Sequence, residues 1–340
     1  PIAVLSAMRE SAQYHISVKG GKFLENMAKA DTVVFDKTGT LTHATPTVAQ
    51  IVPFGGHSET EMLRLAACLE EHYPHSIANA VVEEAKRRGL DHQEYHSQVQ
   101  YIVAHGISSM VDGEKVIIGS AHFVFEDEKC VIPDGEQEKY EQLDPSYSNL
   151  YLCIGGTLAA VLCICDPLRA EAAQAVRALH DCGISNVVMM TGDNRRTAQA
   201  VAKAVGVDEV HAEVLPEDKA AFIRQAREKG HTVIMVGDGI NDSPALSEAD
   251  VGIAISTGAA IAQEIADITV SSEDLMALVT LRQLSCALMA RIHRNYRFII
   301  GFNCSLIGLG LIGILLPTTS ALLHNMSTLG ISMKSMTNLL

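Results

Sequence analysis

The chain has 340 residues, enough for two or more domains, and it carries a formal net charge of -14 at pH 7 with histidine neutral. This acidity argues against a nucleic-acid partner, because phosphate backbones are bound by clustered lysine and arginine. The 8 cysteines are irregularly spaced and form neither a CxxC pair nor a zinc-finger pattern. We therefore expect reduced, mostly buried thiols in a cytoplasmic body.

The chain begins without methionine and without a signal peptide, so we expect a portion of a longer protein. Residues 1–18 have the composition of the inner end of a membrane helix. Lys19 and Lys22 follow, and basic residues beside apolar segments are expected on the cytoplasmic side. An ordinary amphipathic helix is the alternative, because Arg9 and Glu10 interrupt the apolar run.

A β-branched run over Thr32–Phe35 ends abruptly at Asp36, and a lysine, hydroxyls and a glycine come next. Such a run fits a central strand of a parallel sheet that is covered on both faces. Ligands of these sheets bind beyond the carboxyl ends of the strands, so Asp36 is placed where chemistry occurs. Taken alone, an aspartate here is also an ordinary helix N-cap or turn residue.

The stretch Asp36-Lys37-Thr38-Gly39-Thr40-Leu41-Thr42 resembles, at every position, the phosphorylation signature of P-type ATPases, the ion pumps that form an aspartyl-phosphate intermediate. The resemblance implies that Asp36 is the nucleophile, and a carboxylate can indeed hold a phosphoryl group covalently. In the related haloacid-dehalogenase phosphatases an aspartate two positions later acts as general acid and base. Thr38 stands there instead, so we expect a phosphoenzyme that lasts long enough to drive a conformational change.

Residues 46–165 have a different composition and predict an α+β insertion. Helical periodicity covers 60–71 and 77–88, and Gly89 is a helix stop signal. Strand-like segments follow, with Asp112-Gly113 as a hairpin turn between two of them. These segments are 99–103, 108–111, 115–118, 150–154 and 158–164. The insertion occupies the place where P-type pumps carry their nucleotide-binding domain.

Two short stretches of the insertion resemble nucleotide-binding motifs of heavy-metal pumps. His75 matches the histidine of a Ser-Glu-His-Pro motif that holds adenine, and Glu70 or Glu71 could supply the acidic contact. Gly106 stands where the family has a glycine-rich loop, and Gly119 resembles a further glycine near the nucleotide. The resemblance therefore implies an ATP site at His75, Gly106 and Gly119. A surface or helix-start histidine is the alternative for His75.

The α/β character returns from Asp166 to about residue 274. Strand 187–190 ends at a Thr-Gly-Asp loop, a helix is predicted to begin at Leu215-Pro216, and strand 232–236 ends at a Gly-Asp-Gly loop. Strands that alternate with helices predict a parallel sheet with right-handed crossovers, whose strand-end loops meet at one edge. Each loop alone is also an ordinary turn, but four motifs in the family's order favour a single site.

The resemblance assigns roles to these loops. Thr38 and Thr191 would bind phosphoryl oxygens, Asp193 would orient the bound nucleotide, and Lys219 would offset charge on the transferring group. Such positioning and charge neutralisation is what phosphoryl transfer needs. The residues assigned to catalysis are Asp36, Lys37, Thr38, Thr191, Gly192, Asp193, Lys219 and Asn241, and Asp193 also counts among the nucleotide contacts.

A magnesium ion is the second implied cofactor beside ATP, because it prefers carboxylate oxygens and water. The resemblance gives Asp36 and Asp238 as its ligands, with Thr38 and Asp242 in the same metal set and Asn241 organising its surroundings. The chain has no Walker GxxxxGK[ST] sequence, so ATP is not bound by a P-loop.

The last part of the chain predicts a helical stalk and two membrane helices. Residues 275–297 form the stalk with a basic end, 298–317 is long and apolar enough to cross a bilayer, and 320–338 returns. A buried soluble helix pair is the alternative. The resemblance makes Cys304, His324 and Asn325 candidate ligands of the transported ion.

These features predict a haloacid-dehalogenase-like α/β fold: a Rossmann-type parallel sheet (19–45 and 166–274) with an inserted α+β nucleotide-binding domain, plus transmembrane helices at the C-terminus and a partial one at the N-terminus. The resemblance implies the C-terminal portion of a heavy-metal P-type ATPase in the cell (inner) membrane, with its catalytic domains cytoplasmic. Its implied partners are a transition or heavy metal ion, the lipid bilayer, and the actuator domain and upstream membrane helices of the same protein. A soluble haloacid-dehalogenase-type phosphatase and a membrane-anchored nucleotide sensor are the alternatives.

Overall fold

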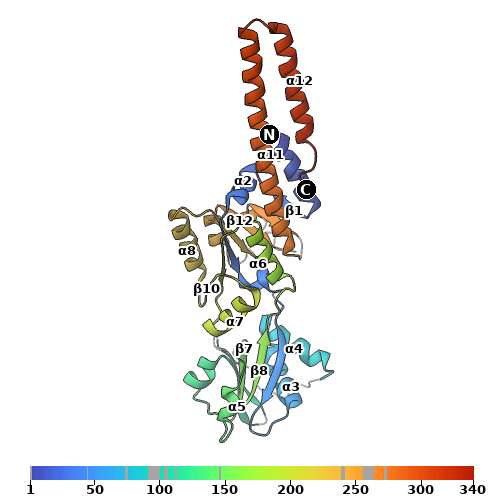
Figure 1. Ribbon diagram of the computed structural model, residues 1–340. Coiled ribbons are helices and arrows are strands. Elements are labelled where there is room, and N and C mark those ends of the chain that lie inside the picture. Colours follow the sequence, from blue (N-terminus) through green and yellow to red (C-terminus); the bar gives the residue numbers. More distant parts are fainter. Residues whose placement is uncertain are drawn as a thin grey trace. The chain divides into compact units, whose positions relative to one another are not determined.

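The structure is a computed structural model that describes residues 2–43, 45–72, 76–90, 100–102, 106–111, 113–144, 147–238, 242–255, 264–271 and 274–340. The chain divides into two compact units, whose elements are labelled in Figure 1. The first unit contains Pro1–Leu41, Ala170–Gly192 and Ala202–Leu340. The second contains Thr42–Arg169 and Asp193–Val201.

The first unit is built on a 7-stranded sheet in the order β1-β13-β12-β11-β2-β9-β10. All neighbouring strands are parallel except β1, which is antiparallel to β13. The central strands β2, β11 and β12 are buried at every residue, as their β-branched sequences predict. The strands are β1 Ile16–Val18, β2 Thr32–Asp36, β9 Asn186–Met190, β10 Glu209–His211, β11 Val233–Gly237, β12 Val251–Ile255 and β13 Ile268–Val270.

Helices cover this sheet through apolar contacts. Side chains of α8 and α9 pack with those of β2, β9 and β11 in one buried cluster. On other sides α2 packs against β12 and α11, and α11 packs against α6. The helices of the first unit are α1 Ile2–Gln13, α2 Gly21–Lys29, α6 Ala172–Asp181, α8 Pro216–Glu228, α9 Ser243–Glu248, α11 Met276–Leu311 and α12 Pro317–Ser335. Helix α7 Arg195–Val205 is divided between the two units, because its residues up to Val201 belong to the second.

The beginning of the chain differs from its prediction. The helix α1 ends at Gln13, and Ile16–Val18 form strand β1, which pairs with Ile268–Val270. The prediction of a membrane helix through residue 18 is therefore wrong at these positions, because the alternating Ile16 and Val18 side chains are buried in the sheet. Strands of three residues such as β1, β10 and β13 leave too little periodicity to be recognised in the sequence.

The second unit is a 6-stranded antiparallel sheet in the order β3-β8-β7-β6-β5-β4. The predicted helices and strands are present with small shifts, and the predicted hairpin joins β5 to β6. Strand β3 and two short helices, η2 and α5, were not predicted. The elements are β3 Thr47–Pro53, α3 Glu59–Glu70, α4 Ser76–Arg87, β4 Gln100–Ile102, β5 Gly106–Val111, β6 Glu114–Gly119, η2 His122–Asp127, α5 Gln137–Glu141, β7 Ser148–Ile154 and β8 Thr157–Cys165.

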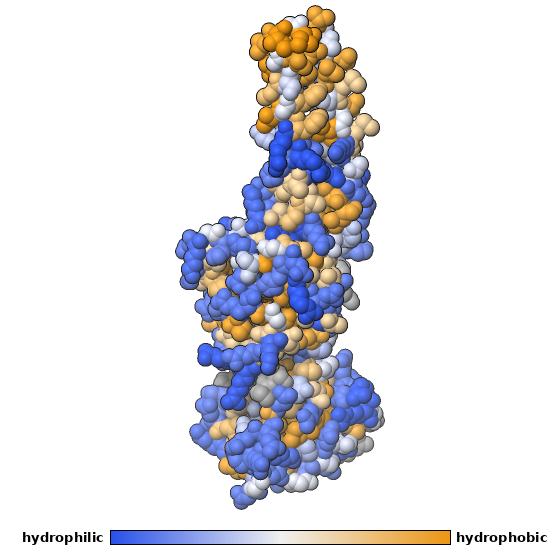
Figure 2. All heavy atoms as spheres, viewed as in Figure 1, coloured by the Kyte–Doolittle hydropathy of each residue, from blue (hydrophilic) through white to orange (hydrophobic). Residues whose placement is uncertain are grey.

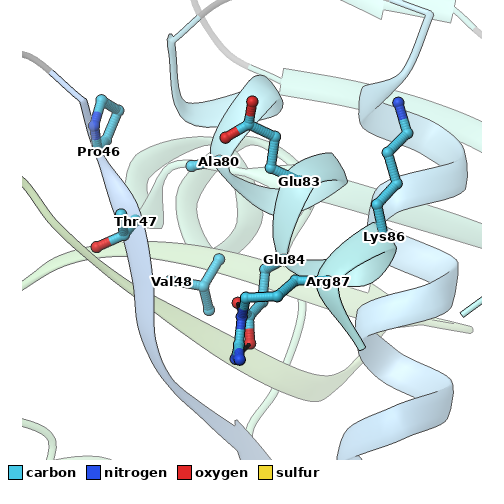
Figure 3. A pocket seen from close by; sticks show the side chains of 8 residues that line it. All are labelled: Pro46, Thr47, Val48, Ala80, Glu83, Glu84, Lys86 and Arg87. Carbon is cyan, nitrogen blue, oxygen red and sulfur yellow. Dashed lines mark hydrogen bonds and ion pairs between the residues drawn. The ribbon is translucent and has the colours of Figure 1, made fainter. Parts of the chain in front are cut away.

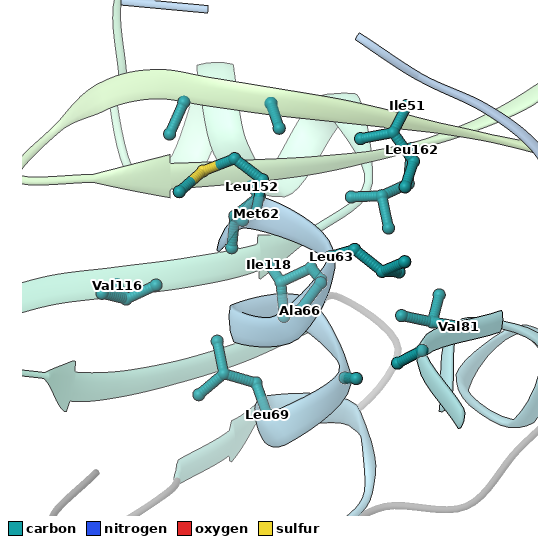
Figure 4. Close-up of a cluster of buried hydrophobic side chains, with 14 of the residues drawn as sticks. Ile51, Met62, Leu63, Ala66, Leu69, Val81, Val116, Ile118, Leu152 and Leu162 are labelled. Atoms are coloured by element: carbon teal, nitrogen blue, oxygen red, sulfur yellow. The ribbon is translucent and has the colours of Figure 1, made fainter. Parts of the chain in front are cut away.

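One core of this unit lies between the sheet and helices α3 and α4 (Figure 4). Leu63 and Leu69 of α3 and Val81 of α4 face Ile118 and Leu152 of the strands, and all five are fully buried. Helix α3 begins where the side chain of Ser58 accepts a hydrogen bond from the Glu61 amide, as an N-cap does.

Helices α11 and α12 form an antiparallel hairpin (Figure 1). No helix in the described part of the chain combines the length and the low polarity needed to cross a membrane. The predicted membrane spans at 298–317 and 320–338 are therefore not confirmed. The apolar part of α11 follows Arg297 and ends with the helix at Leu311, whereas α12 carries polar residues such as His324.

Candidate active site

The site of the first unit is a buried group of two aspartates and a lysine. The Lys219 Nζ atom donates a hydrogen bond to Asp36 Oδ1 at 2.6 Å and another to Asp242 Oδ1 at 2.8 Å. The exposed fractions of these residues are 7% for Asp36, 6% for Lys219 and 1% for Asp242. Three residues far apart in the sequence thus form one charged network shielded from water.

Each member is placed by the end of a secondary-structure element. Asp36 is the last residue of β2, and Lys219 lies in the first turn of α8, which begins with Pro216 at a position where proline is favoured. Asp242 is the N-cap residue of α9. The absence of a side chain at Gly237 permits this packing, because a Cβ atom there would lie 2.5 Å from Asp242 Oδ2.

Burial and clustering perturb the ionisation of all three groups. Loss of hydration, together with the charge of Asp242, raises the pKa of Asp36 to about 7, although Lys219 opposes the shift. Burial also raises the pKa of Asp242, with Lys219 again opposing and Asp238 adding to the rise. Burial alone would lower the pKa of Lys219, but the carboxylates of Asp36 and Asp242 outweigh it and the pKa is raised. A carboxyl group tuned to the physiological range is typical of functional sites.

The loop after Asp36 turns sharply. Residues Lys37–Leu41 form an irregular π-helical turn in which Gly39 adopts φ 73°, a conformation that favours glycine. Lys37 and Thr40 are buried, whereas Thr38 is exposed to solvent. The Thr38 side chain, two positions after Asp36, is therefore accessible to a ligand at the sheet edge.

The loop after β9 lies beside the loop after β2, because the two strands pair in parallel and Asp36 is opposite Met190. Thr191 is buried. Its amide donates to the carbonyl of His211 at 3.0 Å, and its own carbonyl accepts from the Val214 amide at 3.1 Å. The predicted convergence of these two strand ends is present in the first unit.

The donor set fits a hard divalent cation that is completed by water and phosphate. Asp238 is close enough to raise the pKa of both Asp36 and Asp242, so three carboxylates share one region with Lys219. Among the described residues no group of three His, Cys, Asp or Glu side chains forms a metal cage. Magnesium commonly uses one or two carboxylates plus substrate phosphates rather than such a cage.

The remaining residues predicted for this site differ in exposure and in the unit to which they belong. Gly192 is exposed and follows Thr191 directly. Asp193 is half-buried and begins the segment that belongs to the second unit, where the Asn194 side chain accepts a hydrogen bond from the Thr197 amide at the start of α7. Asn241 lies outside the described residues.

In the second unit, the structure brings two predicted nucleotide residues together. Gly106 of β5 is directly opposite Gly119 of β6 in the antiparallel ladder. A Cβ atom on Gly106 would lie 2.4 Å from the Ile118 carbonyl oxygen and 2.6 Å from the Phe123 ring. Close packing therefore requires a glycine at position 106 whether or not a nucleotide binds there. His75 lies outside the described residues.

Glu70 and Glu71, the two alternatives for the acidic contact, differ in environment. Glu70 is the last residue of α3 and only 2% exposed, and burial raises its pKa to about 7. Glu71 is exposed. The sequence alone does not distinguish these two adjacent glutamates. The structure does, because Glu70 is buried and Glu71 is exposed.

A groove of about 710 Å³ lies between the start of β3 and helix α4 (Figure 3). Val48 of the strand faces Glu84 and Arg87 of the helix across it, and Arg87 is paired with Glu84 at 2.6 Å. None of the described residues predicted to bind nucleotide lines this groove. We assign it no function.

The predicted ion ligands lie on the α11–α12 hairpin. His324 Nδ1 is 2.9 Å from the Asn303 side-chain oxygen, so the histidine is linked to α11 beside Cys304. Cys304, His324 and Asn325 are all exposed. Their role in ion binding remains a prediction.

One polar link of the second unit has no signature in the sequence. The Thr42 hydroxyl donates to Asp166 Oδ2 at 2.5 Å, and the backbones of Thr42 and Leu168 form an antiparallel bridge. The two segments at the limits of this unit are thus tied to each other. Both belong to motifs that the sequence did single out, but only the fold shows that they meet.

Comparison with known proteins places this geometry in a family. The family described as haloacid dehalogenase-like hydrolase matches residues 30–250, and the chain belongs to it. Within that class, the chain is similar to metal-transporting P-type ATPases. It is 38% identical to a copper-transporting P-type ATPase of Rhizobium leguminosarum bv. viciae, over 96% of this chain and 38% of the relative. It is 35% identical to a zinc-exporting P-type ATPase of Mycobacterium marinum, over 97% of this chain and 45% of the relative.

Solved structures agree with these sequence relatives. The crystal structure of a zinc-transporting PIB-type ATPase in the E2.Pi state matches with a TM-score of 0.84 and 32% identity, covering 99% of this chain and 54% of that chain. The catalytic domain of the CPx-ATPase CopB-B matches with a TM-score of 0.66 and 25% identity, covering 81% of this chain and 98% of that domain. The chain therefore spans about half the length, or less, of the pumps it resembles.

Proposed function

We propose that this chain is the catalytic part of a pump that couples ATP hydrolysis to metal-cation transport through an aspartyl-phosphate on Asp36. The observation that carries the proposal is the buried Asp36–Lys219–Asp242 network at the carboxyl edge of a parallel sheet. Thr38 supports it further, because a threonine cannot perform the general acid and base chemistry of a phosphatase aspartate.

The phosphorylation step follows from the chemistry of these side chains. An ionised carboxylate oxygen of Asp36 attacks the γ-phosphorus of ATP. A new P–O bond forms while the bond to the ADP oxygen breaks, and ADP leaves with that electron pair. Lys219 holds Asp36 Oδ1, which fixes the carboxylate and places a positive charge beside the transferring group. Thr38 and Thr191 supply hydroxyl donors for the phosphoryl oxygens.

Magnesium and ATP are the cofactors we propose. The carboxylates of Asp36 and Asp238 would hold the ion, with Asp242 and Asn241 beside it, and the ion would neutralise charge on the phosphates. We place the nucleotide in the second unit at His75, Gly106 and Gly119. Glu70 rather than Glu71 is the acidic contact we propose, because Glu70 is buried and burial raises its pKa to about 7. Asp193, Lys37 and Gly192 complete the proposed catalytic set.

The transported species we propose is a transition or heavy metal ion. The relatives are named for copper and zinc, and another, from Mycobacterium bovis, is named a manganese-exporting P-type ATPase. We propose Cys304, His324 and Asn325 as candidate ion ligands in an integral membrane protein of the cell (inner) membrane, with the catalytic units on the cytoplasmic side. An actuator domain and further membrane helices of the same protein would complete the pump.

The test is covalent labelling of the chain. Incubation with γ-labelled ATP and Mg²⁺ should give a phosphoprotein that survives acid and is released by hydroxylamine, as an acyl phosphate is. Asp36→Asn should abolish the label. The matched control Asp181→Asn, an exposed aspartate at the end of α6, should keep it.

Three results would contradict the proposal. Absence of any acid-stable label on the unaltered chain would argue against an aspartyl-phosphate. A label that Asp36→Asn retains would place the phosphoryl group elsewhere. Rapid hydrolysis of simple phosphate monoesters by the unaltered chain would instead favour a phosphatase.

A further inference from the structure

A buried arginine in α11 donates hydrogen bonds to two other helices of the first unit. Arg282 is only 5% exposed, and its Nε atom donates to the Cys182 carbonyl at 3.3 Å. Its Nη1 atom donates to the Met27 carbonyl. A guanidinium group with planar, forked donors suits such double recognition better than a lysine does.

Both acceptors lie at the carboxyl ends of helices. Met27 is in the last turn of α2, and Cys182 is the C-cap residue of α6. The last carbonyls of a helix have no partner within the helix and carry the negative end of its dipole. Arg282 therefore satisfies unpaired carbonyls and places a positive charge where both helix dipoles favour one.

These two helices directly precede, along the chain, the two strands that end at the site. Helix α2 leads into β2, which ends at Asp36, and helix α6 leads into β9, which ends beside Thr191. The amino ends of the strands are joined as well, because the Asp31 carbonyl accepts from the amides of Ser185 and Asn186. Arg282 thus contacts α2 and α6, the helices that lead into β2 and β9. These contacts lie about one strand length, roughly 16 Å, from the nucleophile Asp36.

The same arginine lies on an unbroken helix. Helix α11 runs 36 residues from Met276 to Leu311, about 54 Å at the usual rise per residue. Further along, Arg291 donates to the carbonyls of Thr337 and Asn338 at 2.6 Å, and Asn295 donates to Ser335 at 3.0 Å. A movement at Arg282 would reach the α11–α12 hairpin through one continuous element.

We propose that Arg282 is the positioning residue that couples the phosphorylation site to the helical hairpin. Occupation of Asp36 by a phosphoryl group shifts β2 and β9 with α2 and α6, and Arg282 passes that shift to α11. The inference rests on the proposed function of the same site. It names the connection between that site and the part of the chain that would respond to it.

The experiment compares hydrogen exchange of the full chain with and without Mg²⁺ and beryllium fluoride, a mimic of the aspartyl-phosphate. In the unaltered chain, exchange should slow at least about threefold both in the Asp36–Thr42 loop and in α11 around Arg282–Arg297. Arg282→Gln should keep the slowing of the loop and lose that of α11. Arg282→Lys keeps the positive charge but not the forked guanidinium donors, and it should restore part of the slowing of exchange in α11.

The controls separate the possible failures. Arg177→Gln removes an exposed arginine from α6 and should behave like the unaltered chain. A thermal unfolding curve shows which variants fold, and Arg282→Lys carries the test if Arg282→Gln does not. An α11 response that both Arg282 variants keep in full, or an unaltered chain whose loop responds while α11 does not, would overturn the coupling. An unaltered chain whose loop does not respond would overturn the proposed function.

Discussion

Lys219 is the residue on which the charge balance of the site depends. It is the positive group that bonds both Asp36 and Asp242, at 2.6 Å and 2.8 Å. We expect Lys219→Gln to slow phosphoenzyme formation by about 10²–10³-fold, because a preorganised positive charge is lost where negative charge develops. The initial rate of labelling at saturating MgATP measures this. The exposed Lys229→Gln at the end of α8 is the matched control, and a rate for Lys219→Gln within tenfold of the control would contradict the argument.

Glu70 offers a separate prediction on stability. Its pKa is raised from 4.5 to about 7 in the folded chain by burial, so the folded state binds the proton more tightly than the unfolded state does. The stability that comes from this protonation is full below pH 4.5 and is lost as the pH rises through 7. Glu70→Gln, which is neutral throughout, should therefore be more stable than the unaltered chain at pH 8 by about 2–3 kcal/mol and nearly equal to it at pH 4.5.

Urea unfolding across this pH range, with amide exchange of α3 as the local probe, measures the difference. Glu71→Gln changes the exposed neighbour and should show no such pH dependence. If the two variants gave parallel curves, the burial of Glu70 would not be the source of the effect.

At the scale of elements, the sequence predicts best where a run is long and its environment uniform. Strands β2, β9 and β11 are continuous apolar runs, and the parallel arrangement brings their loops together as expected. The edge strands β1 and β10 were missed because three residues carry almost no period.

The candidate site was predictable in part for the same reason. The order of their motifs is enough to assign the segments that hold Asp36, Lys219 and Asp242 to one sheet edge. That Lys219 would bond both aspartates, or that Glu70 rather than Glu71 would be buried, depends on tertiary packing that spacing does not encode.

The pairing of β5 with β6 allows a test of why Gly106 is a glycine. A methyl group there would meet the Ile118 carbonyl and the Phe123 ring. We expect Gly106→Ala to destabilise the second unit by about 1–3 kcal/mol without any nucleotide present, as overpacking does. Urea unfolding followed by circular dichroism measures it. Gly308→Ala, in open space on α11, should cost nothing or stabilise slightly. Equal stabilities of Gly106→Ala and the unaltered chain would show that packing is not what requires this glycine.

At the scale of the whole molecule, the α11–α12 hairpin exposes a large apolar surface that no contact among the described residues covers. Large apolar side chains gather on it, as Figure 2 shows, and Ile307, Leu311 and Ile314 are 63%, 84% and 68% exposed. Soluble surfaces rarely leave contiguous apolar patches of this kind open to water. Basic residues such as Arg294 and Arg297 precede this apolar part along α11, an order that suits the boundary of a bilayer.

We therefore expect the chain to float with phospholipid vesicles in a density gradient. The triple change of Ile307, Leu311 and Ile314 to aspartate should reduce the floating fraction at least about tenfold, because each aspartate at membrane depth costs about 2.5–3.5 kcal/mol. Val131→Asp, at an apolar side chain that is 59% exposed in the second unit, is the matched control and should float as the unaltered chain does. A triple variant that floats equally well would show that the hairpin surface does not meet lipid. The interactions that cover it would then have to come from protein.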